Sequence, residues 1–189
     1  MAPRLNIIIG STRPGRVGPL VAEWFEAFAR EHGKFEPALV DLAAFNLPVY
    51  DEPQHPRLRQ YEKPHTTEWS RSVDAADAFV FVTPEYNYFA PPALINAIDL
   101  VYHEWAAKPA GIVSYGGASG GMRSAQMLKL LLTSVKVMPL PESVAVHNVR
   151  GALDASGKVA PTELMTGSAK TMLDELHRWA EALKPLRAK

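Results

Sequence analysis

The chain has 189 residues, of which 47% are hydrophobic and 21% charged, values that are typical of a folded protein and exclude a disordered one. It contains no cysteine, which excludes disulfides, thiolate nucleophiles, cysteine-ligated metals and dithiol redox cycles. Because 20 Lys and Arg residues balance 20 Asp and Glu residues, we expect neither nucleic acid nor a membrane as a partner. The length fits a single domain over residues 1–189.

The apolar segments of the sequence are all too short to span a membrane. The apolar run at residues 5–9 follows Arg4, is interrupted by Asn6 and ends at Gly10. Because this run is too short for the core of a signal peptide, we expect a cytoplasmic protein.

Apolar runs typical of strands alternate along the chain with segments of helical periodicity. Ile7, Ile8 and Ile9 stand together, as expected for a strand that is buried on both faces of a sheet. After Pro92, the spacing of Leu94, Ile98, Val101 and Trp105 predicts one buried helical stripe. In chain order we predict a strand at 4–9, a helix at 17–31, strands at 35–41 and 79–83, a helix from Pro92, a strand at 111–114, a helix from about Gly121, a strand at 142–146 and a last helix marked by Met172, Leu176, Trp179 and Leu183.

Five short apolar strands that alternate with helices predict an α/β fold, with a doubly wound parallel sheet covered by helices on both faces. Ligands of such sheets bind beyond the carboxyl ends of the strands, near the switch in strand order. The loops after the first, third and fourth strands are therefore the candidate sites.

Two longer connections interrupt this pattern. Residues 43–65 hold Pro48, Pro53, Pro56 and Pro64, and we consider both a lid or substrate wall and a plain surface excursion for them. Residues 147–160 are predicted to form an ordinary hairpin-like insertion.

The loop after the first strand, residues 10–18, is rich in glycine and precedes a helix. Free backbone N–H groups and the positive end of the helix dipole favour phosphate at such a turn. The hydroxyl of Ser11 and the guanidinium groups of Arg13 and Arg16 add further donors. The alternative is a strand–helix turn without a ligand.

The spacing of the glycines in this loop indicates which kind of phosphate-containing ligand it could bind. Gly10 and Gly15 have P-loop spacing, but Arg16 and Val17 stand where a P-loop has Lys and Ser or Thr. A dinucleotide fingerprint fails at Thr12, and Asp41 lies too far along to be its ribose acid. A mononucleotide monophosphate is the remaining interpretation.

The loop after the third strand runs from Thr83 to Phe89 and is rich in aromatic side chains. It is typical of a stacking wall, with Asn87 as a polar contact to the edge of a ligand. The alternative is a lead-in to the next helix whose aromatics simply pack.

The sequence G-S-T-R-P-G-R after the first strand and P-E-Y-N after the third resemble the NADPH-dependent FMN reductase family, with its quinone, azo and chromate reductases. The resemblance implies a flavodoxin-like fold with strand order 2-1-3-4-5. It implies FMN as cofactor and NADPH or NADH as co-substrate. Many relatives carry Ser at the position of Arg16 and Asn at the position of Gly18.

The resemblance also implies roles for residues of the three loops. Ser11, Arg13 and the helix N-terminus, with Arg16 and Gly18, would hold the phosphate, and Pro84, Glu85, Tyr86 and Asn87 would line the isoalloxazine ring. Tyr115, Gly116 and Gly117 would lie at its pyrimidine side. The family forms dimers or tetramers, and Arg123 with Glu142 is a possible pair between subunits.

The loop after the fourth strand contains a motif that is typical of a different enzyme class, the serine hydrolases. Residues 117–121 read G-x-S-x-G, with Ser119 as nucleophile and with Asp154 and His177 following in hydrolase order. This motif explains neither the arginine-containing loop nor P-E-Y-N. We therefore treat a serine hydrolase as the less favoured alternative.

We predict a flavoprotein that passes hydride from NAD(P)H through FMN to a small acceptor, such as a quinone, an azo or nitro compound, a free flavin or a metal oxyanion. The side chains then position the cofactor, and none is nominated as an obligate acid or base. A flavodoxin-type electron carrier is the alternative. The two arginines of the first loop and the zero net charge argue against it.

Overall fold

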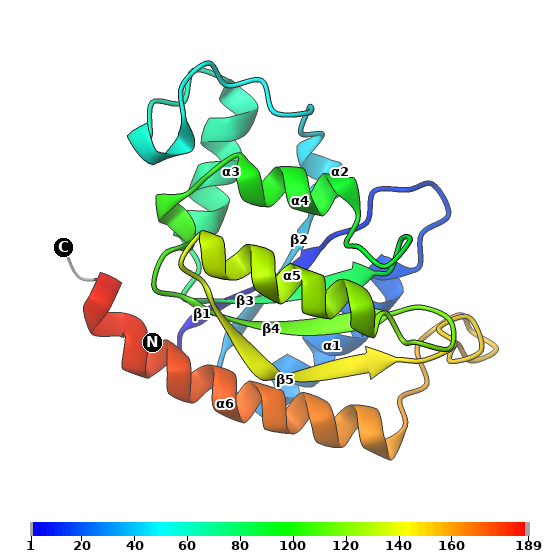
Figure 1. Cartoon of the computed structure of the whole chain (residues 1–189). Coiled ribbons are helices and arrows are strands. Elements are labelled where there is room, and N and C mark those ends of the chain that lie inside the picture. The colour runs from blue at the N-terminus through cyan, green and yellow to red at the C-terminus, as the bar shows by residue number, and fades with distance from the viewer. Residues whose placement is uncertain (1, 188–189) are drawn as a thin grey trace.

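The computed structural model, which describes residues 2–187, has a five-stranded parallel sheet at its centre (Figure 1). The strand order is β2-β1-β3-β4-β5, which confirms the predicted doubly wound topology. All four neighbouring pairs are parallel, so the carboxyl ends of the strands meet at one edge. The strands are β1 (Arg4–Ile9), β2 (Glu36–Asp41), β3 (Ala78–Pro84), β4 (Pro109–Tyr115) and β5 (Met138–Val146).

Helices cover both faces of the sheet (Figure 1). On one face lie α1 (Gly18–His32) and α6 (Glu163–Arg187), and on the other lie α3 (Pro64–Asp74), α4 (Pro92–Asp99) and α5 (Met122–Ser134). Short elements are α2 (Leu42–Phe45) and the 3-10 helices η1 (Pro56–Leu58) and η2 (His103–Trp105). Among the helices of residues 2–187, none has the length and apolar character needed to cross a membrane.

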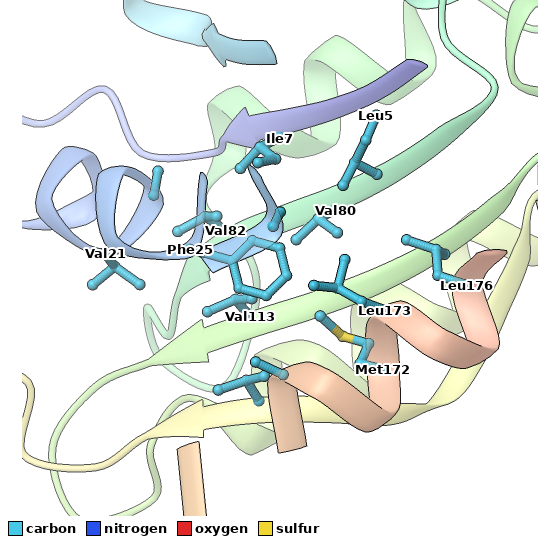
Figure 2. Close-up of a cluster of buried hydrophobic side chains, with 14 of the residues drawn as sticks. Leu5, Ile7, Val21, Phe25, Val80, Val82, Val113, Met172, Leu173 and Leu176 are labelled. Carbon is cyan, nitrogen blue, oxygen red and sulfur yellow. The ribbon is translucent and has the colours of Figure 1, made fainter. Parts of the chain in front are cut away.

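The sheet separates two hydrophobic clusters because successive side chains of a strand point to opposite faces. On β3, Val80 and Val82 join the cluster under α1 and α6, shown in Figure 2, whereas Phe79 and Phe81 join the cluster under α3, α4 and α5. Each fully buried side chain of this size stabilises the fold by about 1.5–3 kcal/mol. This two-sided burial explains the uninterrupted apolar runs of the sequence.

Two predicted elements differ from the structure. The helix that begins at Pro92 ends at Asp99, so Val101 and Trp105 lie beyond it, although both remain buried. Strand β5 begins at Met138 instead of 142. It pairs only with β4, and an edge strand tolerates Pro139 and Pro141 because it needs fewer backbone donors.

The long connection after β2 is fixed by hydrogen bonds within itself and to the body of the protein. The Glu52 carboxylate accepts hydrogen bonds from the backbone N–H groups of Glu62 and Lys63, at 2.9 and 3.0 Å. Arg59 and Tyr61 donate to the buried carboxylate of Glu104. These ties favour the surface-excursion interpretation. The connection at 147–160 is hairpin-like as predicted, with an antiparallel bridge between Leu153 and Val159.

Candidate functional site

The three loops singled out in the sequence meet at the carboxyl edge of the sheet, beside a fourth segment that follows β5. They enclose an open pocket of about 130 Å³. The pocket lies where β1 neighbours both β2 and β3, the position at which the strand order switches. Its lining residues are Arg13, Gly15, Arg16, Val17, Pro84, Glu85, Tyr86, Tyr115, Gly116, Val149 and Arg150.

The loop between β1 and α1 presents unbonded backbone donors. Within residues 2–187, the N–H groups of Ser11, Thr12, Arg13 and Gly15 have no protein acceptor. Helix α1 begins without a side-chain cap at Val17. Free donors at a helix N-terminus favour an anion, the kind of ligand that the sequence predicts for this loop.

Ser11 and Gly18 lie beneath this loop, fully or almost fully buried, and are held by Tyr115. The Tyr115 hydroxyl donates to Ser11 Oγ at 3.0 Å. A Cβ added at Gly18 would lie 2.6 Å from Ser11 Oγ and 2.7 Å from the Tyr115 hydroxyl. Glycine at position 18 therefore makes room for this contact. Burial raises the pKa of Tyr115 to about 12, so its hydroxyl remains a donor at neutral pH.

The two arginines of the loop differ in their partners. Arg16 Nη1 and Nη2 lie 2.6 Å from Asp41 Oδ1 and Oδ2, and Nη1 also donates to the carbonyl of Ser11. Partial burial raises the pKa of Asp41, but hydrogen bonds from Arg16 and from the Ala43 amide outweigh burial and lower it overall. Arg13 is exposed, lines the pocket and has no side-chain partner within residues 2–187.

The loop after β3 turns sharply at its tip. Tyr86 and Phe89 exchange two backbone hydrogen bonds, and Asn87 and Tyr88 between them have φ values of 51° and 75°. This left-handed conformation is unusual for a tyrosine. Of the predicted ring-lining residues, Pro84, Glu85 and Tyr86 line the pocket, whereas Asn87 lies outside its lining.

Glu85 ties this loop to the start of α5. Its carboxylate accepts hydrogen bonds from the Ser119 hydroxyl at 3.1 Å and from Arg123 Nε at 2.6 Å. The guanidinium of Arg123 also lies over the ring of Tyr88, 4.2 Å from its centroid. Arg123 therefore has an ion-pair partner within its own chain, and the pairing of Arg123 with Glu142 of another subunit stays a prediction.

The glycine-rich turn after β4 offers fewer free donors than expected. The Gly116 amide donates to the carbonyl of Val146, at 3.2 Å, and so is already used within the protein. Gly117 lies outside the pocket lining, and its carbonyl accepts hydrogen bonds from the Gly120 and Asn148 amides. Within residues 2–187, the amides of Gly117 and Ala118 have no acceptor.

The residues of the alternative hydrolase do not form a triad. Asp154 caps its own turn through Ser156 and Lys158, and the ring of His177 packs edge-on against Phe35. Neither contacts Ser119 among residues 2–187, and Ser119 donates to Glu85 instead. The arrangement that nucleophilic catalysis requires is therefore not assembled.

Sequence reasoning missed the fourth wall of the pocket. Val149 and Arg150 reach the site because the Asn148 and Val149 amides donate to the carbonyls of Gly117 and Gly116, both at 2.9 Å. Arg150 is exposed and has no acidic partner within residues 2–187. A basic residue shortly after a parallel strand was the available signal, but the segment reads as an ordinary insertion.

Comparisons with known proteins show the family of this chain. The family model for NADPH-dependent FMN reductase matches residues 3–151. The NAD(P)H-dependent FMN reductase of Schizosaccharomyces pombe is 40% identical over 129 residues, which are 67% of this chain and 64% of that protein. The enzyme of the same name from Saccharomyces cerevisiae is 36% identical over 173 residues, covering 77% of this chain and 91% of that protein.

A solved structure supports the fold. The flavoenzyme NAD(P)H:(acceptor) oxidoreductase FerB from Paracoccus denitrificans matches 96% of this chain and 98% of its own, with a TM-score of 0.75 and 23% identity. The family match covers the three strand ends that form the pocket. The chain therefore belongs to the NADPH-dependent FMN reductase family.

Proposed function

We propose that this oxidoreductase binds FMN in the pocket at the carboxyl edge of the sheet and uses NAD(P)H to reduce small acceptors there. The observation that carries the proposal is the loop between β1 and α1, where Arg13 and Gly15, both with unbonded amides, line the pocket and the side chain of Arg13 has no partner within residues 2–187. These groups fit a terminal phosphate monoester, which FMN has and riboflavin lacks. The whole chain, residues 1–189, is proposed to act as a single domain.

The roles proposed for the side chains follow from their positions. Arg13, the Ser11 hydroxyl and the free amides would hold the phosphate, with Gly18 giving Ser11 its space. Pro84 and Tyr86 would form one wall beside the ring, and Gly116 the backbone edge on the other side, followed by the free amide of Gly117. Asn87 lies at the tip of the loop, outside the pocket lining. We expect its side chain to contact the edge of the flavin ring once FMN is bound.

When bound, FMN supplies the redox chemistry by accepting a hydride from NAD(P)H and returning the electrons to an acceptor. The chain's own task is to bind and orient. Glu85, held by Ser119 and Arg123, fixes the wall after β3 against the start of α5. No side chain is required as an acid or base, because the wall residues act by position.

The acceptor is proposed to be small and planar, such as a quinone or an azo compound. Relatives named NADPH:quinone oxidoreductase, from rice, and NADPH azoreductase, from a Bacillus strain, support this class. The pocket is open, which suits acceptors that exchange with the nicotinamide at one exposed face. The prediction of a cytoplasmic protein stays a prediction.

The direct test is anaerobic mixing of the purified yellow protein with NADPH, and separately with NADH. We expect the visible absorbance of the bound flavin to fall, and to return when a quinone is added in equimolar amount. A flavodoxin-type carrier would leave the absorbance unchanged without a separate reductase. That result would overturn the proposed activity while leaving the flavin site intact.

We also propose that the chain self-associates. An apolar groove beside the loop after β3 is lined by Phe89, Ile95, Met127 and Leu130, and the side chains of Phe89 and Leu130 are exposed. Two copies that pair the same face would bury this groove in both. Light scattering at micromolar concentration should give a dimer or tetramer, and Leu130→Glu should lower the mass. A monomeric parent protein would contradict this proposal.

A further inference from the structure

In the loop between β1 and α1, Arg16 is the arginine whose charge is already balanced by a carboxylate of the protein. Its two terminal nitrogens meet the two carboxylate oxygens of Asp41 side by side, each at 2.6 Å. This is the two-pronged arrangement that makes an arginine–carboxylate pair strong and directional. Arg16 and Asp41 together therefore form a unit of zero net charge at neutral pH.

The pair also joins two strand ends. Asp41 is the last residue of β2 and lies opposite Ile9 in the register of the sheet, while Arg16 lies at the end of the loop that follows β1. Arg16 Nη1 donates in addition to the carbonyl of Ser11, at the start of the same loop. The guanidinium thus links both ends of the loop to the neighbouring strand.

Ser11 is consequently held at two points. Arg16 binds its carbonyl, and the Tyr115 hydroxyl binds its Oγ. With Oγ serving as the acceptor for Tyr115, the Ser11 hydroxyl proton is left to donate elsewhere. The free amides of Ser11, Thr12 and Arg13 belong to the stretch that this network shapes.

We propose that Arg16 and Asp41 are a charge-neutral positioning pair that shapes the phosphate-binding loop, and that Arg16 is not itself a ligand of the phosphate. This inference rests on the proposed function, because it concerns the same phosphate site. It assigns the charge that attracts the phosphate to Arg13, while Arg16 acts through the backbone of Ser11.

The two roles for Arg16, phosphate ligand or partner of Asp41, predict opposite effects on FMN affinity when both residues are replaced by neutral ones. If Arg16 binds the phosphate, its loss weakens FMN binding whatever stands at position 41. If the pair is neutral and structural, Arg16→Gln alone is harmful mainly because it leaves the Asp41 charge unpaired beside a dianion. Replacing Asp41 by Asn as well removes the repulsion and leaves two uncharged amide side chains, which can hydrogen-bond to each other and keep the link between the loop and β2.

The experiment compares Arg16→Gln with the double variant Arg16→Gln/Asp41→Asn. Asn retains the oxygen that accepts the Ala43 amide and is a good N-cap, so α2 is preserved. Each purified protein is dialysed against graded FMN or riboflavin, and binding is read from flavin fluorescence. We expect FMN affinity to fall about tenfold in the single variant and to return to within about threefold of the parent in the double variant.

Riboflavin serves as the internal control, because it lacks the phosphate; its affinity should stay within about twofold in all variants. Arg30→Gln removes an arginine that pairs with Glu26 elsewhere on α1, and it should change neither affinity. A double variant that binds FMN as weakly as the single variant would overturn the positioning role.

Failure of the proposed function gives a different result in the same experiment. If the parent protein binds riboflavin as tightly as FMN, the phosphate site itself is wrong. If the parent prefers FMN and only the rescue fails, the site stands and the charge-neutral role of the Arg16–Asp41 pair is overturned.

Discussion

The two ends of the sheet use charge in different ways. At the carboxyl edge, Arg13 and Arg150 line the pocket with no acidic partner within residues 2–187. At the amino edge, Lys108 Nζ donates to the carbonyls of Val73 and Asp74, at 2.9 and 3.0 Å, and Arg187 donates to Asp77. The cationic side chains at the carboxyl edge are therefore free to bind a ligand, whereas those at the amino edge stabilise the fold.

The amino edge also has the larger cavity, about 630 Å³ against about 130 Å³ at the carboxyl edge. Its charged lining residues nevertheless have partners within the protein, including Arg59, which pairs with Glu104. Burial lowers the pKa of Lys108 to about 8, and its carbonyl partners are the end of α3. Size alone would therefore select the wrong cavity, whereas unpaired donors select the carboxyl edge.

The largest expected effect is on stability, at the amino edge. Glu104 is fully buried and accepts hydrogen bonds from Arg59, Tyr61 and Ser70. Glu104→Ala leaves these donors without their acceptor and should lower the free energy of unfolding by about 2–4 kcal/mol. Urea denaturation measures the loss. FMN affinity of the folded fraction should not change. A loss of affinity would contradict the assignment of stability to the amino edge and of FMN binding to the carboxyl edge.

At the carboxyl edge, Arg13→Ala should remove a charge-assisted contact of about 1.5–3 kcal/mol. FMN affinity should fall about tenfold to hundredfold, with little change in stability. Arg13→Lys should restore part of it, because a point charge cannot make a two-pronged contact. Equilibrium dialysis checks the result. Unchanged FMN affinity in Arg13→Ala would assign the phosphate to the backbone amides and Ser11.

The sequence predicted the sheet well because β1, β3 and β4 are buried on both faces and so appear as apolar runs. It missed the start of β5, one of the two edge strands, because Pro139 and Pro141 disguise its first half. The loops of the site were found because a parallel sheet brings its carboxyl ends together. The partners within the site were missed because they are distant in sequence: Asp41 for Arg16, Arg123 for Glu85, and Arg150 for the pocket.

Tyr115→Phe should have an intermediate effect, because it removes only the hydroxyl that donates to Ser11 Oγ. A single hydrogen bond of this kind contributes about 1 kcal/mol, so FMN affinity should fall about fivefold. Riboflavin affinity should not change. Because the pKa of Tyr115 is raised to about 12, the effect should be the same throughout the neutral pH range. An equal loss for both flavins would place Tyr115 beside the ring instead of beneath the phosphate loop.

The smallest expected effect is at Arg150, which is exposed and lies at the rim of the pocket. Arg150→Ala should weaken FMN binding about threefold at low salt, and by less at physiological salt, where exposed charges are screened. Arg178→Ala, on the exposed side of α6, is the matched control and should have no effect on flavin binding. A loss of FMN affinity in Arg150→Ala that does not depend on salt would indicate a buried contact. Arg150 would then be a second phosphate ligand beside Arg13.

The central claim is that the carboxyl edge recognises a phosphate. Parallel dialysis of the parent protein against FMN and riboflavin tests it most directly. Arg13 and the free amides together should make FMN bind about a hundredfold more tightly, with the preference shrinking as salt is raised. Equal affinity for the two flavins at low salt would contradict the account.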